Sequence, residues 1–200
     1  MKLRLLATSI SLLALVISKE ASGQDWKLAS EKNGITVYTR EKEGSPIKEF
    51  KAEAHFDADI NKIAPIVSDI STYPQWYDHC KSAREISKTD NSSVYYMEYS
   101  MPFPFSNRDI VNQSTYQKKG KTVIIAFQQK EGVLEAIDDI VRMPISQGSW
   151  TLTSNKDGTT HVIHQYLGDP AGNVPTGIVN MFLVAGPINT LTQLRAYIGE

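Results

Sequence analysis

The stretch GDPAGNVPTGIVNMFLVAGPINTLTQLRAYI, from Gly168 to Ile198, decides what kind of fold this 200-residue chain can adopt. The turn-forming letters DPAGN precede Pro175, and proline is favoured at the first position of a helix. The pattern that follows predicts a helix from Pro175 to Ile198. We expect Gly186-Pro187 to bend this helix, because proline removes a backbone hydrogen-bond donor.

The first half of this helix carries more apolar surface than one buried face needs. The stripe at helical spacing that we expect to be buried comprises Ile178, Met181, Phe182, Ala185, Leu191, Leu194 and Ile198. Val179, Leu183 and Val184 lie off that stripe. We therefore expect the surplus face to contact a loop, a membrane or a partner.

Strand patterns dominate the chain before this helix. The segments expected to form strands are 34–40, 47–56, 82–89, 94–101, 108–117, 122–129, 140–144, 146–154 and 160–168. Short turns separate most of them, which favours an antiparallel sheet. A short helix is expected over Trp26–Glu31, and Asp59 is expected to cap a helix that Pro65 kinks or breaks. One face of the sheet needs a cover, and the C-terminal helix is the long apolar element available.

Alternation along the strands separates an inner from an outer face. In VYYMEYSM, Glu98 is expected to face water together with Val94 and Tyr96. The residues expected on the inner faces include Tyr95, Met97, Tyr99, Trp150 and Leu152. These side chains are either ordinary core or the lining of a ligand cavity. Tyrosine and methionine together favour a cavity, because tyrosine offers a polar tip and methionine adapts to irregular shapes.

The N-terminus has the pattern of a secretory signal peptide. Lys2 and Arg4 precede the apolar run LLATSISLLALVIS, and the small residues Ala21-Ser22-Gly23 follow it. We expect cleavage after Gly23, which leaves 24–200 as a single domain; an uncleaved anchor is the alternative. Cys80 is the sole cysteine, which excludes an intrachain disulfide. A periplasmic or secreted location is expected.

Composition and motifs argue against several classes of function. The net charge is −1 and there is no Lys/Arg cluster, so nucleic-acid binding is not expected. No nucleophile, metal-binding or nucleotide-binding motif is present, so we expect no catalytic residue, no metal and no cofactor. His161 and His164 would point to opposite faces of one strand. Cys80, beside His79, is expected to be a small buried or half-buried thiol.

The segment MPFPFSNRDIV, residues 101–111, places apolar residues on irregular backbone just before a strand. Its two prolines exclude a helix or a central strand. Arg108 and Asp109 have two interpretations. They either form partly buried ion pairs that fix the strand at the sheet edge, which we favour, or Arg108 binds a phosphate or carboxylate on a ligand.

An ordered set of motifs resembles the START domain family, the lipid-transfer domains related to the steroidogenic acute regulatory protein. PFPFSNRDIV is similar to the family's proline/aromatic segment followed by Arg-Asp. The other landmarks are STYPQWYDHCKSAREI, Val141-Arg142, Gly148-Ser149-Trp150 and the turn GDPAGNVPTGIVN. The resemblance spans Trp26 to Ile198. Ala171 is a mild departure from a glycine-rich turn.

The resemblance implies an α+β helix-grip fold, in which a curved antiparallel β-sheet wraps around the long C-terminal α-helix and leaves an internal hydrophobic cavity. The expected ligand-binding residues are Tyr95, Met97, Tyr99, Trp150, His164, Met181 and Phe182. Arg108, Asp109 and Arg142 are expected to be structural. The cavity acid and arginine of some sterol-binding members fall near Tyr95 and Ser114, which are uncharged, so sterol specificity of that type is not expected.

The function implied is non-enzymatic binding and transfer of a lipid or similar hydrophobic small molecule. The ligand would exchange during transient contact of the C-terminal helix with a membrane, and the protein would act as a monomer. Two alternatives remain at this point. One is an aromatase/cyclase-like enzyme of the same superfamily, and the other is a ligand-free module that binds a partner through the apolar helix face.

Overall fold

The structure, a computed structural model, describes residues 25–43, 45 and 47–200. The predicted signal peptide, residues 1–23, lies outside the described residues. The strands are β1 (Lys27–Lys32), β2 (Ile35–Arg40), β3 (Glu49–Phe56), β4 (Cys80–Lys88), β5 (Ser92–Tyr99), β6 (Arg108–Lys119), β7 (Thr122–Gln129), β8 (Val141–Arg142), β9 (Ile145–Ser154) and β10 (Thr160–Asp169). The helices are α1 (Ile60–Ser68), the 3-10 helix η1 (Ile70–Gln75) and α2 (Thr176–Ile198).

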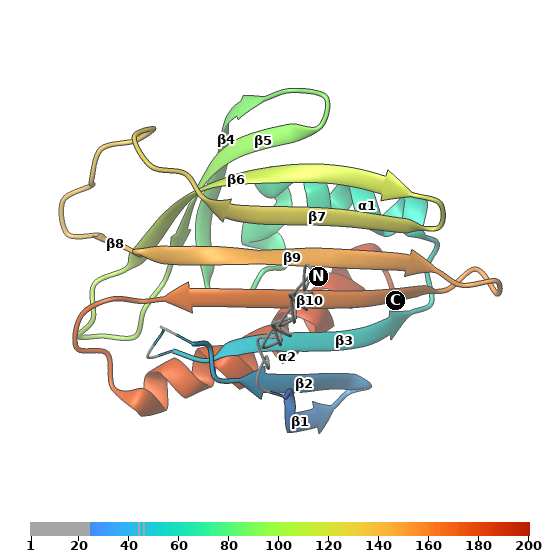
Figure 1. The fold of residues 1–200 in the computed structure, drawn as a ribbon, viewed down its shortest axis with the longest axis horizontal. Coiled ribbons are helices and arrows are strands. Elements are labelled where there is room, and N and C mark those ends of the chain that lie inside the picture. The colour runs from blue at the N-terminus through green and yellow to red at the C-terminus, as the bar shows by residue number, and fades with distance from the viewer. Residues whose placement is uncertain (1–24, 44, 46) are drawn as a thin grey trace, which may run out of the picture.

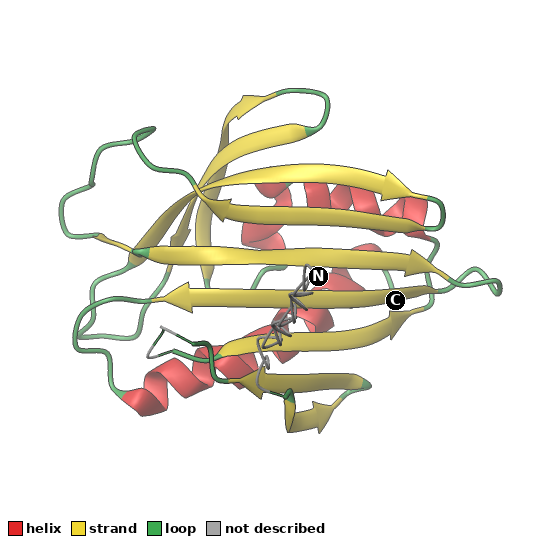
Figure 2. Ribbon diagram, in the orientation of Figure 1, coloured by secondary structure: helices red, strands yellow, loops and turns green. Residues whose placement is uncertain are grey.

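Nine of the strands form one antiparallel sheet in the order β1-β2-β3-β10-β9-β7-β6-β5-β4 (Figures 1 and 2). The short strand β8 pairs with β6 in parallel. The antiparallel sheet predicted from the short turns between the strands is therefore confirmed. The two edge strands are irregular: the pairing register shifts at Leu28/Ser30 in β1 and at Cys80/Ser82 and Glu85/Ser87 in β4.

One local prediction near the N-terminus was wrong, and of the two outcomes expected at Pro65, a kink or a break, the break is excluded. The segment expected to be a helix, Trp26–Glu31, lies mostly in strand β1, which pairs with β2. Six residues do not distinguish the helical from the extended period, and pairing with a neighbouring strand decides. Pro65 does not break α1, which continues to Ser68. The predicted cap is confirmed, because the Asp59 carboxylate accepts a hydrogen bond from the Asn61 N–H.

Helix α2 runs without interruption through Gly186 and Pro187. Its fully or nearly buried apolar residues are Leu183, Ile188, Leu191, Leu194 and Ile198. Leu183 thus belongs to the buried face, against the predicted stripe, while Phe182 is only half-buried. At the other end, Pro175 occupies the N-cap position and supplies no side-chain hydrogen bond. Within the described residues, no helix is long and apolar enough to cross a membrane.

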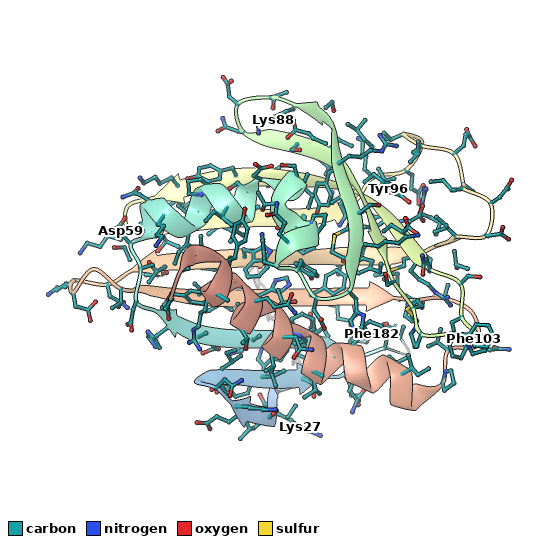
Figure 3. The ribbon with its side chains drawn as sticks, turned by 180° about the vertical axis from the view of Figure 1, so that it is seen from behind. Lys27, Asp59, Lys88, Tyr96, Phe103 and Phe182 are labelled. Carbon is teal, nitrogen blue, oxygen red and sulfur yellow. The ribbon has the colours of Figure 1, made fainter. Side chains whose placement is uncertain are left out.

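Helices α1 and α2 lie on the same face of the sheet, as the view from behind shows (Figure 3). Helix α2 packs against β1, β2 and β3, and α1 packs against β9. One apolar core joins the sheet to both helices. The interior between α2, η1 and the sheet is the place where a ligand cavity can form.

Candidate functional site

A cluster of aromatic side chains fills the interior between η1 and the central strands. The Trp150 and His164 rings, from paired positions on β9 and β10, stack in parallel with centroids 3.8 Å apart. Trp76 meets Trp150 edge-on at 5.9 Å. Both strands present these residues inward because side chains alternate along a strand.

Helix η1 and the turn after it supply three of these aromatic rings. Tyr73 and Trp76 are buried, and Tyr77 packs against the core. The segment STYPQWYDHC was named only as part of a landmark of the resemblance, without any residue assigned to the site, so these residues are additions to the predicted site. Three aromatic residues within Tyr73–Tyr77 were the available signal, because so many large apolar rings are seldom left in water.

Three small voids follow one another through the interior, with volumes of about 80, 60 and 10 Å³. Tyr99 lines all three, and Phe50, Tyr166 and Phe182 line the two larger ones. The three voids thus share walls formed by these residues. Ligand pockets commonly measure ~300–1,000 Å³, so this interior is largely closed by its own aromatic residues.

The structure brings most of the predicted ligand-binding residues together. Tyr95, Met97, Tyr99 and Trp150 line the smallest void, and Phe182 lines the two larger ones. Their role in binding a ligand stays a prediction. The side chain of Met181 lies outside the described residues. Lining residues that the sequence analysis missed are Phe50, Tyr77, Met101, Phe127, Met143 and Tyr166.

His164 lies behind Trp150 and is 1% exposed. Its Nδ1 is 3.3 Å from the Ser149 carbonyl, and its Nε2 is 3.1 Å from the Tyr77 hydroxyl. A carbonyl can only accept, so Nδ1 carries the proton and Nε2 accepts from Tyr77. Burial lowers the pKa of His164 to about 3. The ring is therefore neutral at physiological pH.

A chain of polar groups continues along the inner face of β5, β6 and β9. The Asn112 amide donates to the Ser146 hydroxyl at 2.9 Å and to the Tyr95 hydroxyl at 3.4 Å, and Ser146 in turn lies 3.3 Å from the Tyr166 hydroxyl. The Asn112 Oδ1 atom is buried and has no hydrogen-bond partner among the residues that the structure describes. Burial raises the pKa of Tyr95 and Tyr166, so both phenols stay protonated.

Asp109 forms an ion pair, and its partner is Arg142, which the sequence analysis did not specify. Arg142 Nε and Nη2 donate to the two Asp109 oxygens at 2.6 and 3.0 Å, and Asp109 is 1% exposed. The hydrogen bonds that Arg142 donates to Asp109 raise the pKa of Arg142. Arg142 also donates to the Leu134 carbonyl and so holds the loop before β8.

Within the described part of the chain, Arg108 does not form the ion pair that we favoured. Its guanidinium donates to the carbonyls of Pro170 at 2.9 Å, Ala171 at 3.3 Å and Ser106. Strand β6 is also not a sheet edge, since it lies between β5 and β7. Arg108 therefore fastens the turn that precedes α2 to the sheet. The partners lie 62 and 63 residues away in sequence, which is why the pattern could not show them.

Glu98 was expected to face water and does not. It lies on the outer face as predicted, but it is 8% exposed because Asn107 and Lys81 cover it. Burial alone would raise the pKa of Glu98, and hydrogen bonds from Asn107 and Lys81 outweigh this effect and lower it.

The Cys80 thiol is buried as expected, and burial raises its pKa to about 12.

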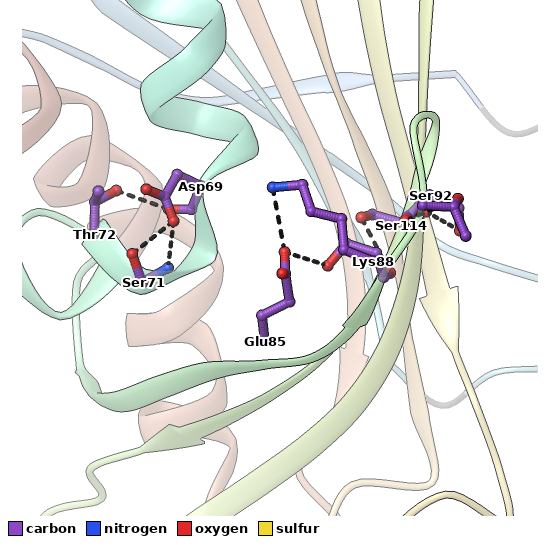
Figure 4. Close-up of polar contacts among 9 residues, drawn as sticks. Asp69, Ser71, Thr72, Glu85, Lys88, Ser92 and Ser114 are labelled. Atoms are coloured by element: carbon purple, nitrogen blue, oxygen red, sulfur yellow. Dashed lines mark hydrogen bonds and ion pairs between the residues drawn. The ribbon is translucent and has the colours of Figure 1, made fainter.

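A second hollow, of about 320 Å³, lies outside this interior, between α1 and the β4–β5 hairpin. Hydroxyl and amide groups from residues 88–93 form much of its rim. Figure 4 shows local contacts around it: Lys88 pairs with Glu85 at 3.4 Å, and Ser92 donates to the Ser114 carbonyl at 2.8 Å. These contacts hold the hairpin in shape.

Apolar side chains are exposed at the end of the sheet where α2 begins. Phe103 is 96% exposed, and Val133 and Ile137 are 36% and 38% exposed (Phe103 in Figure 3). The loop of Phe103 adjoins the first half of α2, because Met101 lines the same void as Val179 and Phe182. Met101 of the proline segment and Val179 of the surplus apolar face thus line the same void.

The sequence profile of the START domain family matches residues 11–200. The chain belongs to the START domain family. The expected helix-grip fold, with its antiparallel sheet around a C-terminal helix, is confirmed. Among the residues that the structure describes, no group of histidine, cysteine, aspartate and glutamate side chains is arranged to hold a metal ion.

Relatives of this START domain include bacterial and mammalian proteins. An uncharacterized protein of Pseudomonas aeruginosa is 28% identical over 181 residues, 90% of either chain. The rat phosphatidylcholine transfer protein is 27% identical over 167 residues, covering 80% of this chain and 77% of that one. The solved STAR-related lipid transfer protein of Xanthomonas axonopodis is 32% identical, has a TM-score of 0.80, and covers 88% of this chain and 99% of that one.

A cyclase also shares the fold. The Zhui aromatase/cyclase of Streptomyces superposes with a TM-score of 0.56 at 10% identity, over 75% of this chain and 92% of that one. At this identity the likeness shows the fold alone.

Proposed function

We propose that this START domain is a non-enzymatic carrier that binds a lipid or a similar hydrophobic molecule between the sheet and α2. The observation that carries the proposal is the line of voids in which Tyr99 and Phe182 form shared walls. Side-chain rotation can join these voids without unfolding any strand. Relatives named as lipid transfer proteins support the proposal.

Burial of apolar surface would supply the free energy of binding, at ~25 cal/mol per Å² removed from water. Acyl chains or rings would replace the aromatic contacts that now close the interior. The voids of about 80, 60 and 10 Å³ are too small for a lipid as they stand. Binding therefore requires α2 or the aromatic side chains to move.

The first half of α2 is the element we expect to move. Pro175 provides no side-chain cap, and Val179, Phe182 and Val184 are only half-buried. The second half is anchored by Leu191 and Leu194, which are both fully buried. A helix held this way would open at its N-terminal half, beside the exposed Phe103, where a membrane could receive or deliver the ligand.

The interior groups favour a carrier over an enzyme of the aromatase/cyclase kind. Tyr77, Tyr99 and Tyr166 have pKa values raised by burial, so they hold their protons at neutral pH. The neutral His164 has a pKa of about 3. An efficient general acid or base has a pKa near the operating pH, which none of these groups has.

The test is native mass spectrometry of the mature protein purified from its own host, followed by extraction of any bound lipid and by transfer of fluorescent lipid between vesicles. One bound lipid per chain and vesicle-to-vesicle transfer are expected. Phe182→Asp should abolish transfer, because a carboxylate in the wall of both larger voids opposes apolar burial.

A matched control tests the interior more narrowly. Met97→Trp places a larger side chain into the void that Met97 lines, whereas Val94→Trp places it on the outer face of the same strand. We expect Met97→Trp alone to block uptake, with both variants checked for folding by circular dichroism. Equal transfer by both, or no bound lipid and no transfer by the wild type, would contradict the carrier proposal. A ligand-free module that binds a partner would then be favoured.

We further propose that the chain is exported, cleaved after Gly23, and active as a monomer in the periplasm or outside the cell. The mass of the mature protein and its light-scattering molar mass test both points. An intact N-terminus on the exported protein, or a stable dimer, would contradict them.

A further inference from the structure

Arg108 is a buried cation without an anionic partner. It is 5% exposed, and among the described residues its guanidinium forms no ion pair. The nearby carboxylates are engaged elsewhere: Asp109 binds Arg142, and Asp169 accepts from the Ala171 N–H at 2.8 Å. Burying a charged group costs free energy unless the group is paired with an opposite charge. Holding the turn before α2 does not by itself account for an unpaired guanidinium at this place.

The hydrogen bonds of Arg108 leave part of its guanidinium unused. Its bonds to the carbonyls of Ser106, Pro170 and Ala171 occupy three of five N–H groups. Burial lowers the pKa of Arg108, and no acidic neighbour counteracts this effect. Two donors and a full positive charge therefore remain available.

The position of Arg108 indicates the chemical class of ligand that it would bind. It lines the void of about 80 Å³ whose other walls include Met101, Met143 and Phe182. A fixed cation thus stands in the wall of an otherwise apolar space, at the end of the interior nearest the start of α2. An amphipathic molecule that carries one anionic group matches this combination.

We propose that Arg108 binds the phosphate or carboxylate of an amphipathic ligand whose apolar part enters the interior, an inference that rests on the proposed carrier function. The guanidinium is planar and binds both oxygens of a carboxylate or phosphate in a fork. Because the same group holds the carbonyls of Pro170 and Ala171, an arriving anion would compete with the turn that precedes α2.

The test compares matched fluorescent probes that share acyl chains and differ in charge. Phosphatidylcholine is compared with diacylglycerol, and a fatty acid with the corresponding alcohol. We expect Arg108→Gln to weaken binding of the phosphate and carboxylate probes by about 10- to 100-fold, as for lost hydrogen bonds to a charged group, and to leave the neutral probes unchanged. Arg108→Lys should recover part of the loss. Arg84→Gln, an exposed change of equal charge on β4, should have no effect.

Several outcomes would overturn the assignment. Equal weakening of charged and neutral probes would make Arg108 a turn anchor only. Tight binding of inorganic phosphate alone would point to a free anion rather than an amphiphile. If Arg108→Gln does not fold, the wild-type preference for charged over neutral probes decides, and no preference refutes the assignment. A wild type that binds no probe at all refutes the carrier proposal instead.

Discussion

Phe103 offers the cleanest test of where this START domain meets a membrane. The side chain is 96% exposed, so Phe103→Ala removes almost no contact within the folded protein. We expect the free energy of unfolding to change by less than ~0.5 kcal/mol, as for other surface substitutions. If Phe103 inserts into a membrane, its burial contributes ~1.5–3 kcal/mol, and losing it weakens vesicle binding about 10- to 100-fold.

The assay is flotation of the protein with phospholipid vesicles, with lipid transfer measured in parallel. Leu28→Ala is the matched control, because Leu28 is 62% exposed and lies on β1, the edge strand farthest in the sheet order from the β5–β6 loop. We expect the control to bind vesicles like the wild type. Unchanged vesicle binding by Phe103→Ala, or an equal loss in both variants, would refute membrane contact through this loop.

Three further predictions concern buried groups. His164 has a pKa of about 3 when folded and near 6.5 when unfolded, so above pH 6.5 the ring is neutral in both states and carries no penalty. As the pH falls from 6.5 towards 3, only the unfolded state binds the proton, and the fold loses about 2 kcal/mol of stability by pH 5. His164→Asn should remove that share of the pH dependence in urea titrations. Asp109→Asn should destabilise the fold by about 3 kcal/mol because Arg142 loses its buried partner, while the exposed Asp138→Asn should not, and equal urea midpoints would contradict this. Native Cys80, whose thiol pKa is raised to about 12, should react with iodoacetamide only after unfolding, and rapid native labelling would show the thiol to be accessible.

The strands and their inner faces were predictable because alternation is a local signal. Tyr95, Met97 and Trp150 follow directly from the period of two, and all three are buried on the inner face. For Glu98, alternation predicted the outer face correctly but the exposure wrongly. Alternation assigns a side chain to a face of the sheet and does not show whether other residues cover that face. Asn107 and Lys81 come from other parts of the chain to cover that carboxylate.

The site was harder to predict because its contacts are long-range. Two of the carbonyls that Arg108 binds, those of Pro170 and Ala171, lie 62 and 63 residues later in the chain. The rings of Tyr73–Tyr77 reach the interior only because η1 folds back over β9 and β10. Side-chain periodicity carries no information about such long-range contacts. The residue pattern left both a ligand cavity and an ordinary core open, and the family resemblance decided for the cavity.

The irregular edges of the sheet have a consequence for solubility. An open sheet ends in two strands with unpaired backbone groups, which can recruit strands from other molecules into aggregates. Here the register shifts at Leu28/Ser30 in β1 and at Cys80/Ser82 and Glu85/Ser87 in β4 interrupt both edges. Charged residues such as Lys27, Lys32 and Lys88 stand on the same strands. Because of these irregularities, neither edge offers a long regular strand with which a strand of a neighbouring molecule could pair. This should oppose aggregation of a protein that consists largely of strands.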